Sequence, residues 1–462
     1  MSVDKNRDAV ELKIAYLGGG SRGWARDLMS DLAVCPDLKG QVDLYDINLE
    51  AAQLNARLGA WIQQRPEAAS EWSYRSVNKI EDALLDADFV VCSVQPGPLE
   101  AMEADLTIPE RYGLLYPVGD TAGAPGLVRG LRAAIIYAGF AEAIAEHCPD
   151  AWVINYTNPM TICTRTLTRV APDLRVFGCC HEVFGTQEML ARLVEKHLGM
   201  PKPSRHEVEV NVLGINHFTW LDSAFYQGND LLDLLAYDIA QPGVVRPYTE
   251  AEVKAWGNYF RSAEQVAFAL FQRYGWLAAA GDRHLAEFVP GFLVDEATIY
   301  RYGFSRTPIS YRYNRWQELS SVAERIISGE IPYTVRHSNE EAVEQMRALV
   351  GLGDMFTNVN MENAGQVANL PLGAVVETNA RFSQDSVRPL VAGALSDGVL
   401  NLTLPHVHNQ EMIVEAALSR DKDLAFQAVF SDPLTHLPID KAWEMFSAML
   451  EATKDYLPGF DL

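Results

Sequence analysis

The residues with the greatest chemical potential in this sequence stand side by side between positions 176 and 186. Cys179, Cys180, His181 and Glu182 bring thiol, imidazole and carboxylate groups together, after an apolar approach and before a Gly-Thr turn. Thiolate with imidazole suits a transition metal such as Zn, Mn or Fe, and thiolate alone favours Zn. Free cysteines are also common as small buried hydrophobic residues. The stretch therefore indicates a metal site only if other parts of the chain support it.

A second motif lies near the N-terminus, in a strand-loop-helix pattern. Residues 13–17 form a short apolar strand, and residues 24–34 carry apolar side chains at helical spacing. The loop between them fits G-x-G-x-x-G, and an acid ends the next strand about 20 residues further on, as in dinucleotide sites. Glycines let the backbone approach a pyrophosphate, and the acid accepts from a ribose hydroxyl and repels a 2′-phosphate. The pattern predicts an NAD site, preferred over NADP, formed by Gly18, Gly20, Ser21, Gly23 and Asp46.

The first 200 residues alternate between strand and helix patterns. Apolar strands are expected at 87–94, 151–155 and 174–178, and a long helix at 131–145. Such alternation predicts an α/β fold with a doubly wound, Rossmann-type parallel sheet, whose ligands lie outside the carboxyl ends of the strands. The dinucleotide loop and the Cys-His pair are therefore expected at the same edge, with three polar residues that follow strands, namely Ser93, Asn155 and Asn158.

The pattern changes at about residue 205, where helices become dominant and strands few. A chain of 462 residues is too long for one typical core. We therefore expect a dinucleotide-binding domain at 1–204 and a mixed, mainly helical α/β domain at 205–462. The second domain is expected to cover the site and to supply the interface of a homodimer or homotetramer.

Composition excludes several kinds of partner. The net charge of -23 argues against nucleic acid or an anionic membrane, and an anionic substrate would need local arginines. The N-terminal residues 1–13 contain no apolar run or cleavage site, so no signal peptide is expected. No run of about 18 apolar residues occurs, so no membrane span is expected. The 6 cysteines do not form a disulfide framework in so long a chain, which fits a reducing cytoplasm.

Six short motifs occur in the order seen in glycoside hydrolase family 4, which the chain resembles from about residue 13 to beyond 371. This family depends on NAD and does not use the usual pair of carboxylates. The Cys-His-Glu-Val motif at 180–183 resembles the α-galacturonidase group, whose substrates are small α-linked galacturonides from pectin. The other motifs are Gly-Gly-Gly-Ser at 18–21, Ile-Asn-Tyr-Thr-Asn-Pro at 154–159, Gly-Ile-Asn-His-Phe-Thr-Trp at 214–220, Gly-Asp-Arg-His at 281–284 and Asn-Leu-Pro at 369–371.

The resemblance implies a role for individual residues. Cys180 and His217 resemble the protein ligands of a divalent metal, usually manganese. His181 resembles the acid for the leaving oxygen. For the base that removes a sugar proton, Asp282 is the first candidate and His284 the second. The residues expected at the nicotinamide or the substrate are Asn155, Asn158, Glu182, Arg283 and Asp120, and the candidates to hold a uronate carboxylate are Arg283, Arg129 and Arg132.

The chemistry implied by the resemblance involves no net oxidation. NAD takes a hydride from C3 of the sugar, a base removes the C2 proton, the aglycone leaves by elimination, and water and the hydride are then added back. Other interpretations stay open, because His217 can be a core histidine and Asp282 a helix N-cap. The alternatives for the whole protein are an α-glucuronidase, α-glucosidase or α-galactosidase of the same family, a plain NAD-dependent hydroxy-acid dehydrogenase, and a non-catalytic nucleotide sensor.

Overall fold

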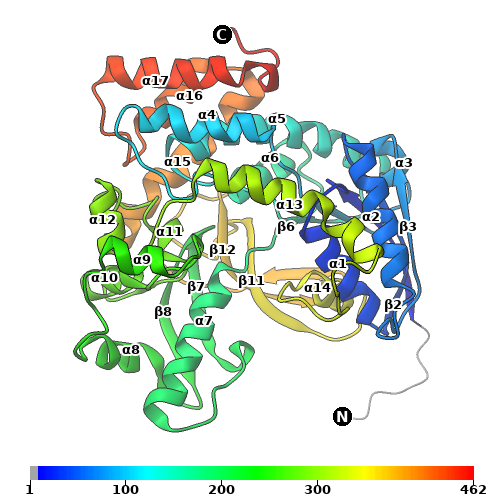
Figure 1. Ribbon diagram of the computed structural model, residues 1–462, viewed down its shortest axis with the longest axis horizontal. Helices are drawn as coiled ribbons and strands as arrows, with labels where there is room; N and C mark the ends of the chain where they lie inside the picture. Colours follow the sequence, from blue (N-terminus) through cyan, green and yellow to red (C-terminus); the bar gives the residue numbers. More distant parts are fainter. Residues whose placement is uncertain (1–8) are drawn as a thin grey trace.

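The computed structural model describes residues 9–462, so the first eight residues, on which part of the signal-peptide expectation rests, lie outside it. Within this range the main element is a nine-stranded sheet that runs from the centre of the molecule to the side occupied by the first strands of the chain (Figure 1). In spatial order its strands are β13 (Ser386–Pro389), β12 (Val375–Ser383), β11 (Met355–Glu362), β6 (Arg175–Gly178), β5 (Trp152–Asn155), β4 (Phe89–Cys92), β1 (Val10–Leu17), β2 (Leu38–Tyr45) and β3 (Trp72–Val77).

The strands β1 to β6 are parallel and lie in the order 3-2-1-4-5-6, which confirms the predicted doubly wound fold. Alternate residues of β1 enter two separate cores: Ile14 and Tyr16 pack on one face of the sheet, and Ala15 and Leu17 on the other. The connecting helices are α1 (Trp24–Val34), α2 (Leu49–Ile62), α3 (Ile80–Leu84), α4 (Leu99–Glu110), α5 (Gly123–His147) and α6 (Met160–Val170).

The second half of the chain extends this sheet. Strands β11, β12 and β13 are antiparallel to their neighbours, and Asn360 of β11 pairs with Gly178 of β6. Two helices of the second half also pack on the first, since α13 (Ile309–Ile327) contacts α2 and α14 (Ala342–Leu349) contacts α1. The division at residue 204 stays a prediction, because the two halves share one sheet.

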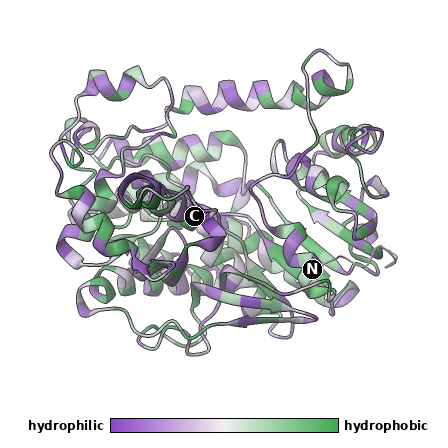
Figure 2. Cartoon of the chain, turned by 90° about the horizontal axis from the view of Figure 1, so that it is seen from below, coloured by the Kyte–Doolittle hydropathy of each residue, from purple (hydrophilic) through white to green (hydrophobic). Residues whose placement is uncertain are grey.

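The rest of the second half is mainly helical, as predicted, around a small sheet of β7 (Glu209–Ile215), β8 (Phe218–Tyr226), β9 (Asn229–Asp230) and β10 (Leu277–Ala278). Hydrophobic residues concentrate in the strands and on inward helix faces (Figure 2). In residues 9–462 no helix has the length and apolar character to cross a membrane. The remaining α-helices are α7 (Glu182–Leu193), α8 (Leu231–Ile239), α9 (Glu250–Ala255), α10 (Gln265–Tyr274), α11 (Asp282–Leu285), α12 (Glu296–Arg301), α15 (Asp397–Ser419), α16 (Lys422–Phe430) and α17 (Ile439–Ala452).

Candidate active site

The loop between β1 and α1 has the geometry of a dinucleotide site. Gly18 has a φ of 96°, and a Cβ there would lie 2.1 Å from the carbonyl oxygen of Ser93, so the position requires glycine. Asp46, directly after β2, accepts hydrogen bonds from the N–H of Gly20 at 2.9 Å and of Asn48 at 2.8 Å. The carboxylate thus holds the loop, and its remaining lone pairs can still accept from a ribose hydroxyl.

Asn55 on α2 holds the same loop from another side, and no motif in the sequence pointed to it. Its Nδ2 donates to the carbonyl oxygens of Gly19 and Ser21, each at 2.8 Å. A Cβ on Gly23 would meet no atom within 4 Å, so this third glycine is not required by packing. Hydrogen bonds from Asp46 and Asn55 therefore fix the loop.

Asp120, His217 and His284 converge in a second group, which we call the His-Asp cluster. Each offers one ligand atom, and these atoms all lie within 4.8 Å of one another, so one metal ion can contact all three. The rings of His217 and His284 have centroids 3.9 Å apart. Sequence reasoning placed Asp120 at the substrate and His284 as a base, and it did not anticipate this convergence. In residues 9–462, Cys180 does not belong to the set of ligand atoms that meets this spacing.

Thr121 orients the cluster. Its hydroxyl donates to Oδ1 of Asp120 at 2.7 Å and lies 3.0 Å from Nδ1 of His217. Because the one hydroxyl proton goes to Asp120, Thr121 accepts from Nδ1–H of His217, which leaves Nε2 with its lone pair. This is the tautomer that a metal ligand needs, and Thr121 was not singled out in the sequence.

The backbone at His217 is strained. Asn216 and His217 form the two-residue connection between β7 and β8, and His217 has a φ of 61°. A left-handed conformation costs a non-glycine residue roughly 1–3 kcal/mol and persists mainly where function requires the side chain. The buried ring contacts Thr121 and lies beside His284, so it faces polar groups of the cluster.

Glu182 adds a second carboxylate beside the cluster. Its Oε1 lies 3.8 Å from Nε2 of His284, and its Oε2 accepts from the N–H of Gly281 at 2.7 Å. Burial works to raise the pKa values of Glu182 and Asp120, but His284, His217 and the neighbouring hydrogen-bond donors and cations together outweigh it and lower each to about 2. Burial and the neighbouring His284 lower the pKa of His217 to about 3. Ionised carboxylates beside a neutral imidazole are the protonation state that metal binding requires.

Cys180 lies next to this group, supported by strands of the second half. Its carbonyl oxygen accepts from Nδ2 of Asn358 at 3.1 Å, and the same amide donates to Glu377 at 2.6 Å. Burial, together with the charges of Glu377 and Glu182, raises the pKa of the Cys180 thiol well above its usual value. The positive charge of a cation would act in the opposite direction and favour the thiolate.

His181 faces the dinucleotide loop. Its ring stacks on Trp24, the first residue of α1, with centroids 5.7 Å apart and planes 26° apart. Its Nδ1 lies 3.1 Å from Oε1 of Glu340. The hydrogen bond to Glu340 raises the pKa of His181, although burial opposes it. A raised pKa of His181 is in keeping with the predicted role as an acid, which stays a prediction.

Two predicted residues form hydrogen bonds to other parts of the protein, although Oδ2 of Asp282 is buried without a partner in residues 9–462 and burial raises the pKa of Asp282 to about 7. Oδ1 of Asp282 accepts from the N–H groups of Val266 and Ala267, each at 3.1 Å, and so caps the N-terminus of α10. Asp282 is therefore a helix cap, which was one of the two interpretations of this residue. The helix that it caps is α10, whereas Asp282 itself lies at the start of α11. Oδ1 of Asn155 accepts from the Tyr137 hydroxyl at 2.7 Å, and the whole Asn155 side chain is buried at 0% exposure.

Three arginines lie near Asp120: Arg129, Arg283 and Arg312. Burial lowers the pKa of each guanidinium, and the Asp120 charge opposes the shift. Each keeps a buried N–H without a partner in residues 9–462, at Nη1 of Arg129 and at Nε of the other two. Arg312, on α13, was not anticipated, because nothing in its local sequence separates it from surface arginines.

Arg132, the third arginine suggested by the sequence, is committed elsewhere. Its guanidinium pairs with Asp105 of α4 at 3.1 and 2.5 Å, and both side chains are buried. Asn158 and Arg129 contact each other, since the carbonyl oxygen of Asn158 accepts from Nε of Arg129 at 3.0 Å. The side-chain Oδ1 of Asn158 is buried without a partner among the described residues. Asn158 and Arg129 thus remain available to a ligand, and Arg132 does not.

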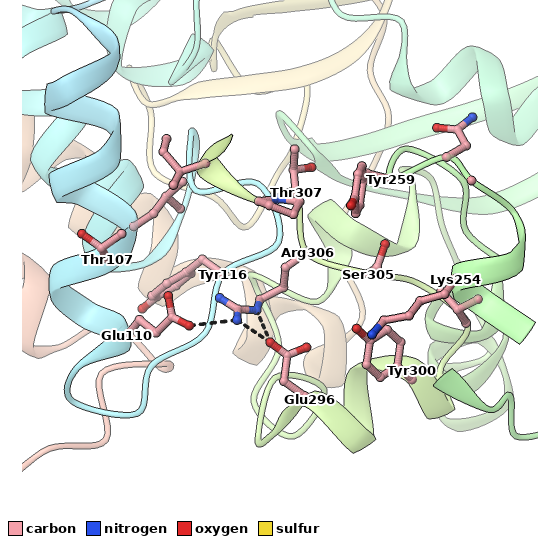
Figure 3. A pocket seen from close by; sticks show the side chains of 16 residues that line it. Thr107, Glu110, Tyr116, Lys254, Tyr259, Glu296, Tyr300, Ser305, Arg306 and Thr307 are labelled. Carbon is pink, nitrogen blue, oxygen red and sulfur yellow. Dashed lines mark hydrogen bonds and ion pairs between the residues drawn. The ribbon is translucent and has the colours of Figure 1, made fainter. Parts of the chain in front are cut away.

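A cavity of about 720 Å³ adjoins Arg283, whose Nη2 donates to the hydroxyl of Thr307 in the cavity wall at 2.5 Å. Its charged groups largely neutralise one another, because Arg306 lies between Glu110 and Glu296 and pairs with both (Figure 3). The cavity is therefore joined to the Asp120 side of the His-Asp cluster only through Arg283, and its lining includes none of the three cluster residues.

Comparison with known proteins covers almost the whole chain. Residues 13–196 match the family model described as Family 4 glycosyl hydrolase, and residues 212–435 match the model of its C-terminal domain. The chain is 46% identical to an alpha-galacturonidase of Thermoanaerobacterium saccharolyticum over 98% of both chains. It is also 46% identical to an alpha-galacturonidase of Bacillus subtilis, over 96% of this chain and 97% of the relative.

Solved structures show the same fold. A crystal structure named as the glucosidase lplD from Bacillus subtilis has a TM-score of 0.90 and 45% identity, with 96% of this chain and 100% of the other covered. A 6-phospho-alpha-glucosidase from gut microorganisms, in complex with NAD and Mn2+, has a TM-score of 0.79 and 20% identity, with 98% and 100% covered. The paired family matches and the high identity over nearly the full length lead to one conclusion: the chain belongs to glycoside hydrolase family 4.

Proposed function

We propose that this protein is an α-galacturonidase that hydrolyses small α-linked galacturonides with NAD and a divalent metal, manganese being our first choice. One observation carries the proposal: the consecutive residues His181 and Glu182 link the two groups, since His181 stacks on Trp24 directly after the dinucleotide loop and Glu182 lies 3.8 Å from His284 of the His-Asp cluster. Three arginines with unused donors lie near Asp120 of the same cluster. Oxidation of a sugar requires a cofactor and charge stabilisation, and a uronate requires guanidinium groups. The Cys-His-Glu-Val sequence and the relatives named alpha-galacturonidase support the choice of sugar.

NAD fits the loop because Gly18 and Gly20 leave no room for side chains and Asp46 stands beside them. Bound there, the cofactor supplies a hydride acceptor for C3 of the sugar. The Asp46 carboxylate disfavours a 2′-phosphate, so NAD is preferred over NADP. The residues we assign to this side are Gly18, Gly20, Ser21, Gly23, Asp46 and Ser93, and the relative solved with NAD and Mn2+ supports the cofactor pair. Asn155 supports this edge of the sheet from within, because its side chain is buried and bonded to Tyr137.

A divalent metal fits the donor set around His217. We assign Nε2 of His217 and the thiolate of Cys180 as ligands, with Asp120 as a further oxygen ligand. Such an ion supplies charge that stabilises negative oxygen on the sugar. We assign His181 as the acid for the leaving oxygen. We assign His284 as the base at C2, in preference to Asp282, because Asp282 caps α10 while His284 lies in the cluster.

Arg129, Arg283 and Arg312 are our candidates to hold the uronate carboxylate, with Asn158 and Glu182 at the sugar hydroxyls. A guanidinium with a free, buried N–H gains most from an anionic partner. Arg312 replaces Arg132 in this set, since Arg132 is bound by Asp105. We further infer a cytoplasmic enzyme of pectin breakdown that forms a homodimer or homotetramer, with no nucleic-acid or membrane partner, in keeping with the net charge of -23.

The test compares two uronides. The protein, supplied with NAD and manganese, is incubated with an α-galacturonide and with the matching α-glucuronide, and free uronic acid and NADH absorbance are followed together. We expect galacturonic acid without net NADH. Preferred release of glucuronic acid would reassign the sugar, and NADH formed in step with product would favour a hydroxy-acid dehydrogenase instead.

A further inference from the structure

Helix α13 crosses from the second half of the chain to the dinucleotide loop (Figure 1). Where it arrives, Nη1 of Arg22 donates to the carbonyl oxygen of Trp316 at 2.7 Å. The Arg22 guanidinium carbon also lies 3.5 Å from the centroid of the Trp316 ring. Arg22 belongs to the G-x-G-x-x-G loop, between Ser21 and Gly23, so a helix distant in sequence contacts the loop near its junction with α1.

Arg22 is not an ordinary surface arginine. Burial lowers the pKa of its guanidinium, and the charge of Asp46 works against that shift. In residues 9–462 its one side-chain hydrogen bond is the Nη1 bond to Trp316. A guanidinium stacked by its face keeps its edge donors, so the other N–H groups can donate to a phosphate.

The same face of α13 also reaches the sugar side. Arg312 precedes Trp316 by one helical turn, so the two side chains share a face. Nη2 of Arg312 donates to the carbonyl oxygen of Val118, two residues before Asp120, at 2.8 Å. The neighbouring Tyr313 donates to Glu103 of α4 at 2.9 Å, which holds the helix in position. One turn of α13 therefore contacts both the dinucleotide loop and the loop that carries Asp120.

We propose that Arg22 and Trp316 form a clamp that retains the dinucleotide in both redox states during one turnover. The inference rests on the proposed function, in which NADH must return its hydride to the sugar that donated it. A cofactor lost as NADH would leave an oxidised sugar and an enzyme without its reductant. Arg22 holds the pyrophosphate, and Trp316 holds Arg22, so Trp316 is a positioning residue.

The test uses the full-length protein with Trp316→Ala, Trp316→Phe and, as a matched control, Trp443→Ala. Trp443 on α17 is also a partly exposed tryptophan, 37% against 41% for Trp316, and it too lies under a cation, from Lys422. Dissociation rates of NAD and NADH are measured by stopped-flow fluorescence, with thermal unfolding as a check of the fold. We expect Trp316→Ala to release both forms about tenfold faster, as loss of a stacked cation implies, and Trp316→Phe to restore most retention.

A double variant sharpens the test, because Arg22→Ala and Trp316→Ala should be non-additive if they act through one contact. With substrate present, Trp316→Ala should also leak NADH into solution while Trp443→Ala does not. Equal release rates for Trp316→Ala, Trp443→Ala and the unchanged protein would overturn the clamp and leave the proposed function standing. If the unchanged protein bound neither NAD nor NADH, the proposed function would fail and the clamp with it.

Discussion

The dinucleotide loop and the His-Asp cluster are built in opposite ways. The loop is held by uncharged backbone groups, whose bonds to Asp46 and Asn55 are already made. The cluster gathers charged or ligating groups, some of which lack a hydrogen-bond partner. Nδ1 of His284, for example, is buried without a partner in residues 9–462. The difference indicates that the loop is a rigid cradle, whereas the cluster is completed by what binds to it.

The largest effect is expected from substitutions that remove an assigned metal ligand and leave the dinucleotide loop unchanged. His217→Ala or Cys180→Ser should lower hydrolysis by about 10³-fold or more, since charge stabilisation by a metal is worth several kcal/mol. NAD affinity should stay within about twofold. Manganese binding, measured by calorimetry, should be lost in both variants, and chelation should inactivate the unchanged protein reversibly. Normal activity of a rigorously metal-free preparation would contradict the metal assignment.

The next effect separates two neighbours on α11. His284→Ala should reduce kcat by about 10²- to 10⁴-fold, the usual contribution of a general base. Asp282→Asn should chiefly alter the melting temperature, because its contacts are to the N-terminus of α10. The measurement is kcat beside thermal unfolding for both variants. A catalytic loss confined to Asp282→Asn, with a normal melting temperature, would return the base assignment to Asp282.

Sequence reasoning succeeded where the determinants are contiguous. β1, the glycines, α1, β2 and Asp46 follow one another within residues 10–46, so local periodicity and spacing were sufficient. It ranked Asp282 above His284 because the base position in the family that the chain resembles carries an aspartate or a tyrosine, and both candidates stand in one motif. Residues two apart on a helix point in different directions, and only the fold shows which direction leads to the cluster.

Long-range assembly explains what the sequence did not reveal. Asp120 and His284 come from segments far apart in the chain, and Thr121 and Arg312 carry no local signal that separates them from other residues. The antiparallel extension of the main sheet by β11 to β13 likewise depends on pairing between distant segments, such as Asn360 with Gly178. Such contacts are set by packing of the whole chain rather than by propensity.

A smaller effect is expected at Arg312, which we assign to the uronate carboxylate. Arg312→Gln should reduce kcat/KM for an α-galacturonide by about 10- to 100-fold, because a hydrogen bond to a charged group is worth about 1.5–3 kcal/mol. Arg315→Gln is the matched control, since Arg315 is exposed on the same helix and pairs with Glu318 at 3.4 Å. Equal kinetic constants for both variants would remove Arg312 from the substrate site.

The smallest effect concerns the stability of α1, which follows the loop. Asp31 accepts from N and Oγ of Ser338, each at 2.6 Å, and burial raises its pKa to about 6. The folded protein therefore keeps a proton that the unfolded chain loses near pH 4, so this group makes the free energy of unfolding fall between about pH 4 and 6. Asp31→Asn should remove on the order of 2 kcal/mol of this fall in the free energy of unfolding. An unchanged slope in denaturant unfolding across this range would contradict the assignment.

The central claim is that the loop and the cluster act on one sugar, by hydride removal at C3 and proton removal at C2. Hydrolysis of an α-galacturonide in heavy water, with the product analysed by NMR, tests it most directly. If His284 exchanges its proton with solvent before returning it, galacturonic acid will carry deuterium at C2 and retain its original hydrogen at C3. Product without deuterium at C2, formed at the same rate with no NAD present, would contradict the account.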